Sequence, residues 1–229
     1  MTQIEKSLPP LPDGPYDLEF FFDVGCPFAW MTSRWIHQVI DAKDIKVGWR
    51  FISLKFINEN NEHVPAGYKR ATEAGLLFHR ICAAARERFG NEAVGRLYTG
   101  YGTSYWYRTL GGDFAEKMAS AAAGVDVAAI IAAADLPAEL IDAADDESWD
   151  TLIRAESDEA FERAGADVGT PIITWGEGGN SMFGPVISSL PDAETAVEFY
   201  DALRVMVDFA DFSEIKRTKR PPLDLPLLT

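Results

Sequence analysis

Two hydrophobic patterns alternate along the chain. Short apolar runs bounded by turn residues predict buried strands, and apolar residues three or four positions apart predict amphipathic helices. Residues 17–23 (DLEFFFD) and 45–54 (IKVGWRFISL) show the first pattern. Between them, the segment that starts at Pro27 shows the second, with Met31 and Trp35 on one face. This order of strand, helix and strand predicts a parallel pair of strands joined by a right-handed crossover.

From about residue 64 to residue 165 the pattern is helical throughout. Residues 76–90 (LLFHRICAAARERFG) predict one helix, and residues 148–164 predict another. Between these two, Asp113 and Glu116 have the spacing of a capping box, so a further helix is expected to start there.

The strand pattern returns after the helical stretch. Residues 171–175 (PIITW) and 181–183 (SMF), separated by the turn sequence GEGGN, predict a β-hairpin. Pro191 is expected to open a long helix, and the tail from residue 216 to residue 229 is expected to be extended. The whole pattern predicts an α/β layer interrupted by a helical insertion.

Composition narrows the class of protein. The 229 residues are 47% hydrophobic, which is enough for a sizeable core, and the formal net charge is −15. An acidic surface repels nucleic acid and anionic lipid, so neither is expected as a partner. No apolar stretch is long enough to span a bilayer and the start carries no secretory signal, so we expect a cytoplasmic protein without membrane contact. Three histidines without a cysteine cluster predict no metal site.

Cys26 is one of only two cysteines, and it stands where the first predicted strand meets the first predicted helix. The free N–H groups and the dipole of a helix N-terminus stabilise negative charge. Such a position can lower the pKa of a cysteine from ~8.5 to roughly 3.5–7.5. The sequence therefore predicts a partly exposed, reactive Cys26 with a lowered pKa. The alternative is a buried, inert cysteine, which is common in proteins.

Thr170 and Pro171 come immediately before the third predicted strand. The order strand–helix–strand, then strand–strand–helix, is that of a thioredoxin fold, in which a proline before the third strand faces an active cysteine. A cis peptide is accessible at an X-Pro bond. We therefore expect a cis bond between Thr170 and Pro171, with the main chain of Thr170 turned toward Cys26 to bind a thiol-containing or extended substrate.

The chain resembles the DsbA-like branch of thioredoxin-fold proteins, and more narrowly the actinobacterial mycothiol-dependent nitroreductases. The resemblance rests on the segments DVGCPFAWMTSRWI, SLKFINENN, ADVGTP and FGPVISSLP and on the late basic KRTKR, and it covers about residues 17–220. It implies an α/β, thioredoxin-like fold interrupted by an all-helical insertion domain. Residues 1–63 and 166–229 would form the discontinuous thioredoxin-like domain, and residues 64–165 would form the insertion.

The resemblance also implies a site and its partners. Cys26 would be the catalytic nucleophile, no cofactor would be tightly bound, and mycothiol or glutathione would be the co-substrate. The substrate- or thiol-binding residues would be Pro27, Phe28, Trp30, Thr170 and Pro171. The partner would be a small-molecule thiol or electrophile, or a protein disulfide, and the oligomeric state stays open.

Ala29 departs from the family pattern Cys-Pro-Trp-Cys, which has a second cysteine at this position. In a dithiol site that second thiol resolves the mixed disulfide formed by the first. The chain is therefore expected to be a monothiol thiol-disulfide oxidoreductase that needs an external thiol. One alternative is a thiol-cofactor enzyme similar to the kappa glutathione transferases and the hydroxychromene carboxylate isomerases. The other is a non-catalytic, degenerate binding protein.

Other candidate residues have simpler interpretations. The aromatic segment TSYWYR (103–108) is expected to pack between helix and sheet rather than to form a lid. Asn58 and Asn60 either line the site or form a turn. His37 and His79 are expected to be helix histidines with satisfied hydrogen bonds. The basic KRTKR segment is expected to be a solvated tail.

Overall fold

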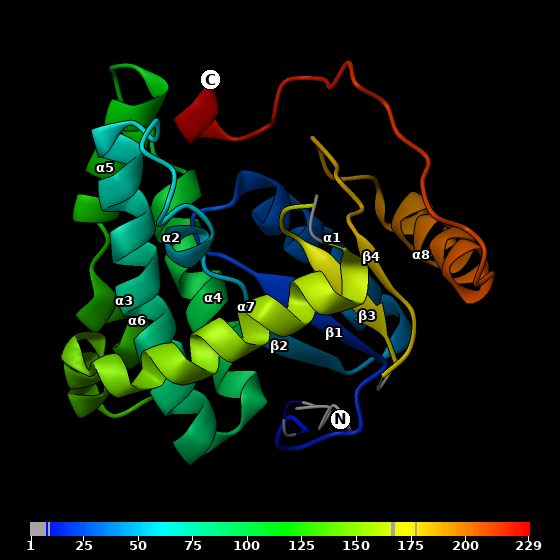
Figure 1. Cartoon of the computed structure of the whole chain (residues 1–229), viewed down its shortest axis with the longest axis horizontal. Coiled ribbons are helices and arrows are strands. Elements are labelled where there is room, and N and C mark those ends of the chain that lie inside the picture. Colours follow the sequence, from blue (N-terminus) through cyan, green and yellow to red (C-terminus); the bar gives the residue numbers. More distant parts are fainter. Residues whose placement is uncertain (1–7, 9, 166–167, 177) are drawn as a thin grey trace, which may run out of the picture.

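A four-stranded mixed sheet forms the centre of this α/β protein (Figure 1). The computed structural model describes residues 8, 10–165, 168–176 and 178–229. Its strands lie in the order β2-β1-β3-β4; β1 and β2 are parallel, whereas β3 is antiparallel to both β1 and β4. The predicted parallel pair and the predicted hairpin are therefore confirmed. The bounds are β1 (Leu18–Phe22), β2 (Val47–Phe51), β3 (Ile172–Trp175) and β4 (Ser181–Phe183).

Strand β1 is buried on both faces, and its side chains divide between two cores with the period of two that a strand imposes. Phe20 and Phe22 belong to the main core, where they lie opposite Trp49 and Phe51 of β2. Phe21 points the other way. It packs in a second, smaller core with Ile52, Ala160 and Ile172.

Helices cover the sheet on both faces. Helices α1 and α8 pack against each other, α3 to α6 group together beside the sheet, and α7 crosses the sheet (Figure 1). The α-helices are α1 (Pro27–Lys43), α2 (Leu54–Ile57), α3 (Ala66–Phe89), α4 (Asn91–Trp106), α5 (Phe114–Ala123), α6 (Val127–Ala133), α7 (Asp150–Ala164) and α8 (Ala193–Asp208). The 3-10 helices are η1 (Ala138–Asp145), η2 (Glu147–Trp149) and η3 (Pro226–Leu228).

Helix α3 is longer than its hydrophobic pattern indicates. It begins at Ala66 rather than at residue 76. Its first turns carry few apolar residues, but Gly67 lies directly against the main chain of Ala115 in α5. A side chain at Gly67 would collide with that main chain, so this tertiary contact, which no periodicity reveals, sets how closely the two helices approach.

The other helix starts lie close to their expected positions. Helix α8 begins after Asp192, which caps it, rather than at Pro191. Helix α7 follows η2 and begins at Asp150 rather than at residue 148. The capping box of Asp113 and Glu116 is present in both directions, which confirms that prediction.

Buried charges fasten α7 to the sheet. The Glu156 carboxylate accepts a hydrogen bond from the Phe51 main-chain N–H at 2.8 Å. It also pairs with Arg50 of β2 at 3.1 Å and with Arg86 of α3 at 2.8 Å. Arg50 continues to Glu19 of β1 at 2.6 Å. The last helix of the expected insertion therefore lies on the sheet and is held there by ion pairs that water does not reach.

Two sequence expectations fall outside the described residues: the domain boundary at residue 166 and, in the hairpin turn, Glu177. Within the part that the structure describes, no helix combines the length and the apolar character needed to cross a membrane.

Candidate active site at Cys26

Cys26 caps the N-terminus of α1. Its backbone is extended, and Pro27 occupies the first helical position, where the missing N–H removes no helical hydrogen bond. The Ala29 N–H donates to Cys26 Sγ at 3.4 Å. The sulfur thus takes the place that a serine, threonine or aspartate oxygen takes in an ordinary N-cap. The predicted position at the strand–helix junction is confirmed.

The main chain of Thr170 reaches the same sulfur from a distant part of the sequence. The Cys26 thiol donates to the Thr170 carbonyl oxygen at 3.2 Å. The Thr170–Pro171 peptide bond is cis, and the Thr170 hydroxyl donates to the Phe21 carbonyl of β1 at 3.1 Å. The fold therefore brings Cys26 and the Thr170–Pro171 segment together.

Cys26 is more buried than the sequence predicts. It is only 7% exposed, and this burial raises the pKa of its thiol to about 12. The N–H groups of Ala29 and Phe28 act in the opposite direction, and the negative charge of Asp23 adds to the increase. The prediction of a partly exposed cysteine with a lowered pKa is therefore wrong for this structure. Loss of solvent outweighs the helix N-terminus.

A buried carboxyl group that the hydrophobic pattern does not reveal holds the Cys26 turn. Asp23 is fully buried, and its two oxygens accept from the Gly25 and Leu54 N–H groups, each at 2.7 Å. Its main-chain carbonyl accepts from the Cys26 N–H at 3.0 Å. Burial raises the pKa of Asp23 to about 6, although the two N–H groups lower it. The sequence does carry one signal for Asp23: an acid that directly follows a buried strand is expected to be buried too and to need hydrogen-bond partners.

Tyrosines from α3 and α4 lie within electrostatic reach of this turn. Burial is the main cause of the raised pKa of Tyr68 and of Tyr98, and the negative charges of Asp23 and Cys26 raise both further. Tyr98 stacks on Phe22 with the ring centroids 4.0 Å apart. Its hydroxyl is buried, and the Arg34 charge and the Ser33 hydroxyl beside it lower its pKa in part. The helical part of the molecule thus places polar hydroxyls beside the Cys26 turn.

Trp30 lies in the contact between α1 and α4. It is fully buried, its ring packs edge-on against Tyr98 at 5.6 Å, and the Arg34 guanidinium lies 4.0 Å from its ring centroid. In this arrangement Trp30 supports the helix that carries Cys26 and offers no surface to a ligand.

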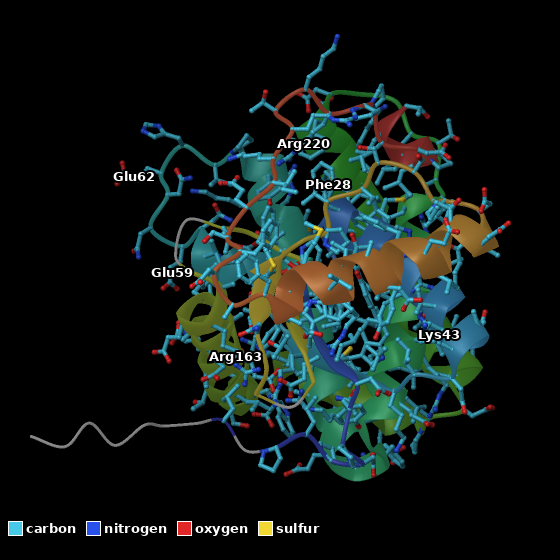
Figure 2. The ribbon with its side chains drawn as sticks, turned by 90° about the vertical axis from the view of Figure 1, so that its right-hand side faces the viewer. Phe28, Lys43, Glu59, Glu62, Arg163 and Arg220 are labelled. Atoms are coloured by element: carbon cyan, nitrogen blue, oxygen red, sulfur yellow. The ribbon has the colours of Figure 1, made fainter. Side chains whose placement is uncertain are left out.

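Phe28 is half-buried in the first turn of α1, and the C-terminal tail reaches it. The Arg220 guanidinium carbon lies 5.1 Å from the Phe28 ring centroid (Figure 2). The KRTKR cations are exposed, as expected for a solvated tail. Pro221 and Pro222, which follow them, are exposed as well. Leu225, just before η3, and Leu227, within it, are by contrast fully buried, so this part of the tail is not solvated.

The aromatic segment 103–108 packs against its neighbours. Tyr105 and Trp106 are buried, which confirms that these rings pack rather than form a lid. The hydrogen-bond partner of Tyr105 lies in a helix and not in the sheet, since its hydroxyl donates to the Met118 carbonyl of α5 at 3.0 Å. Tyr107 is 49% exposed.

The histidines and Asn58 have structural surroundings. His79 is fully buried, and both its ring nitrogens lack a partner among the described residues, as does Nε2 of His37. Both histidines lie in helices, as expected. The expectation of satisfied hydrogen bonds is wrong for His79 and for Nε2 of His37, because both rings pack against aromatic neighbours. Asn58 ends α2 and donates to the Leu54 carbonyl at 2.9 Å, while Asn60 is exposed.

Among the residues described, no second thiol accompanies Cys26. Ala29 is fully buried at the position of the missing cysteine. Cys82 is fully buried in α3, and both cysteines are free. Burial raises the pKa of the Cys82 thiol.

Two cavities described by the structure lie away from Cys26. The larger, about 220 Å³, lies between the N-terminal arm, α3 and α7, and its lining includes Arg86 and Glu156. The smaller, about 110 Å³, lies between α2 and α7. Neither is lined by Cys26 or Thr170. The thiol site is closed in this structure because Cys26 is only 7% exposed.

Comparison with known proteins places the site in a family context. The family model described as Rv2466c-like, mycothiol-dependent nitroreductase Rv2466c, matches residues 25–217. The uncharacterized protein Rv2286c of Mycobacterium tuberculosis is 30% identical over 209 residues, which cover 89% of this chain and 83% of that protein. The matched range includes Cys26, Thr170 and Pro171.

Proposed function

Because this chain belongs to the Rv2466c-like family of mycothiol-dependent nitroreductases, we propose that it is a thiol-dependent oxidoreductase that acts through Cys26 without a second thiol of its own. The observation that carries the proposal is the 3.2 Å contact of Cys26 Sγ with the Thr170 carbonyl at the N-terminus of α1, where Ala29 replaces a resolving cysteine. The element order and this contact also support a DsbA-like, thioredoxin-like fold with a helical insertion.

In the proposed exchange, Cys26 first attacks a substrate disulfide. The Cys26 thiolate forms a bond to one substrate sulfur, the substrate S–S bond breaks, and the released thiolate takes up the proton that Cys26 gave up. An external thiol then attacks the mixed disulfide. The Cys26 thiol is regenerated, and the external thiol leaves as a disulfide with the remaining half of the substrate.

The name of the family suggests mycothiol as the external thiol and a nitro compound as an alternative electron acceptor. Reduction of a nitro group to a nitroso group would consume one Cys26 thiol and one mycothiol thiol. The products would be the nitroso compound, water and the Cys26–mycothiol disulfide. A second mycothiol would then release Cys26 and oxidised mycothiol, so that the atoms and two electrons balance.

Ionisation of Cys26 is the step that the closed site opposes. With a pKa of about 12 almost no thiolate exists at neutral pH. Once solvent or substrate reaches the sulfur, the N–H groups of Ala29 and Phe28 remain in place to stabilise the thiolate. In this account Pro27, Phe28, Thr170 and Pro171 bind the incoming group, and Trp30 positions α1.

The raised pKa of Cys26 also favours a second candidate. A thiol that stays protonated can donate a hydrogen bond to the thiolate of a bound small thiol. That would be the behaviour of a thiol-cofactor transferase or isomerase, with no redox change.

Mass spectrometry after incubation with oxidised mycothiol separates these functions. The oxidoreductase should gain one mycothiol adduct on Cys26, excess reduced mycothiol should remove it, and Cys26→Ser should gain none. Ala29→Cys should instead form an internal disulfide. Non-covalent binding of reduced mycothiol without an adduct would support the transferase, and neither adduct nor binding would indicate a non-catalytic protein.

A further inference from the structure

The last residues of the chain form a strap, residues 216–229, that joins the two parts of the molecule. It leaves the region after α8, contacts the start of α1 and ends beside α5 (Figure 1). The Asp224 N–H donates to the Ser188 carbonyl at 2.8 Å, and η3 packs on α4 and α5. The strap therefore passes from the sheet side to the helical side across the end of the molecule that carries Cys26.

The strap has a firmly held end and a loosely held link. Leu225 and Leu227 are fully buried in the main core, so the end acts as an anchor. The link, residues 216–222, is exposed throughout and has no regular secondary structure. Lys216 pairs with Glu214 at 3.6 Å, whereas the link's other cations form no ion pair with a described residue. The link is thus the part that can move without disturbing the core.

The link contacts the first turn of α1 through Arg220. Arg220 approaches the ring of Phe28, two residues from Cys26, and Figure 2 shows the two side chains at the same end of the molecule. No hydrogen bond or ion pair accompanies this contact among the described residues. A single exposed cation–π contact is weak, so thermal motion can break it.

We propose that the link is a gate over Cys26 and that the Arg220–Phe28 contact is its latch. When the latch breaks, the link moves aside while the leucine anchor stays in the core, and small molecules then reach the sulfur. Cys26 is only 7% exposed, and the proposal assigns part of that cover to the link. The inference concerns access to Cys26, whichever reaction the thiol performs.

The rate of Cys26 alkylation by iodoacetamide, followed by mass spectrometry of the labelled peptide, tests the gate. Arg220→Ala should raise this rate about two- to five-fold, which corresponds to an exposed cation–π contact of about 0.5–1 kcal/mol. Arg220→Lys should stay close to the wild type, because lysine keeps a cation over the ring. Lys219→Ala is the matched control: it removes the same charge from the same link, and it should leave the rate unchanged.

Two further measurements distinguish a gate from a general loosening of the fold. Cys82 is fully buried in α3, so its alkylation rate reports opening of the core and should not change in any of these variants. Phe28→Leu keeps apolar bulk but removes the ring. Adding Arg220→Ala to Phe28→Leu should therefore give no further increase, because both changes break one contact.

Equal Cys26 rates in Arg220→Ala and Lys219→Ala would overturn the latch. A parallel increase at Cys82 would also overturn it, since the variant would then loosen the whole core. Additive effects of the Phe28 and Arg220 changes would mean that the two residues act separately, and that too would contradict the proposal.

Discussion

Two opposing effects act on the thiol of Cys26. The N-terminus of α1 favours the thiolate, whereas burial and the nearby Asp23 charge favour the thiol. Burial prevails in the closed structure. On the proposed account, the helix N–H groups stay in place when solvent enters, so that access controls the reactivity of Cys26.

The pH dependence of Cys26 alkylation tests this balance. Because the pKa of the buried thiol is raised to about 12, the rate should keep increasing, about tenfold per pH unit, from neutral pH to at least about pH 10. The measurement is the iodoacetamide rate at the Cys26 peptide, with Cys26→Ser to show what Cys82 contributes. A rate that levels off below pH 8 would show a lowered pKa and contradict the account.

Asp23→Asn tests the carboxyl group that holds the Cys26 turn. An asparagine oxygen can accept from only one of the Gly25 and Leu54 N–H groups, so at pH 4 the variant should lose about 1–3 kcal/mol of unfolding free energy. The folded pKa of Asp23 is raised from 3.8 to about 6. Its contribution to stability is therefore fully present below pH 4 and is lost as the pH rises through 6.

Urea unfolding at pH 4 and at pH 7 checks that the contribution of Asp23 to stability falls as the pH rises. The penalty of Asp23→Asn should be smaller at pH 7, where the wild type carries a buried charge that the variant lacks. Asp192→Asn, at the exposed N-cap of α8, is the matched control and should change little at either pH, because asparagine caps as well as aspartate. A penalty that grows from pH 4 to pH 7 would refute the raised pKa.

Helix α7 shows how a single element joins the sheet to the helical part. Its Glu156 receives Arg50 from β2, Arg86 from α3 and the Phe51 N–H. A buried anion with these three partners holds α7 in a fixed position on the sheet. Motion that opens the site is therefore expected in the strap rather than in α7.

Glu156→Gln should destabilise the fold strongly. Two buried arginines would lose their shared anion, and breaking a buried ion pair costs about 3–5 kcal/mol. The unfolding free energy in urea measures this loss. Glu59→Gln is the control, because Glu59 pairs with Arg154 of the same helix at the surface and should matter little. Similar small losses in both variants would show that the buried network does not hold α7.

The elements that the sequence predicts well are those with local causes. Strand β1, helix α1, the hairpin and the capping box at Asp113 each follow from a short pattern of apolar, turn or capping residues. The early start of α3 and the position of α7 on the sheet depend on contacts between distant segments, such as Gly67 with Ala115. Those contacts leave no periodic signal.

In the site too, features with local causes can be predicted and features set by distant contacts cannot. The order of elements leads to the meeting of Cys26 with Thr170, because strand ends at one edge of a sheet lie together. The exposure and pKa of Cys26 depend on what covers it, and no pattern near Cys26 encodes that. The roles of Asp23 and Arg220 likewise require knowledge of the partners that the fold supplies.

At the scale of the whole molecule, the sheet and the helical part enclose Cys26, and the strap crosses between them. Cys82 is fully buried in α3, and Ala29 carries no thiol. Under the proposed function, electrons for a second step therefore come from outside the chain. The central claim is that Cys26 forms a mixed disulfide that this protein cannot resolve by itself.

Counting thiols in a single turnover tests that claim most directly. Reduced protein, freed of small thiols, is mixed with an aromatic disulfide that releases a coloured thiolate, and the intact mass is measured at the end. The account predicts one released thiolate per chain and one stable adduct on Cys26, which external thiol then removes. Two released thiolates per chain with no adduct would mean that Cys82 resolves the mixed disulfide, and would contradict the account.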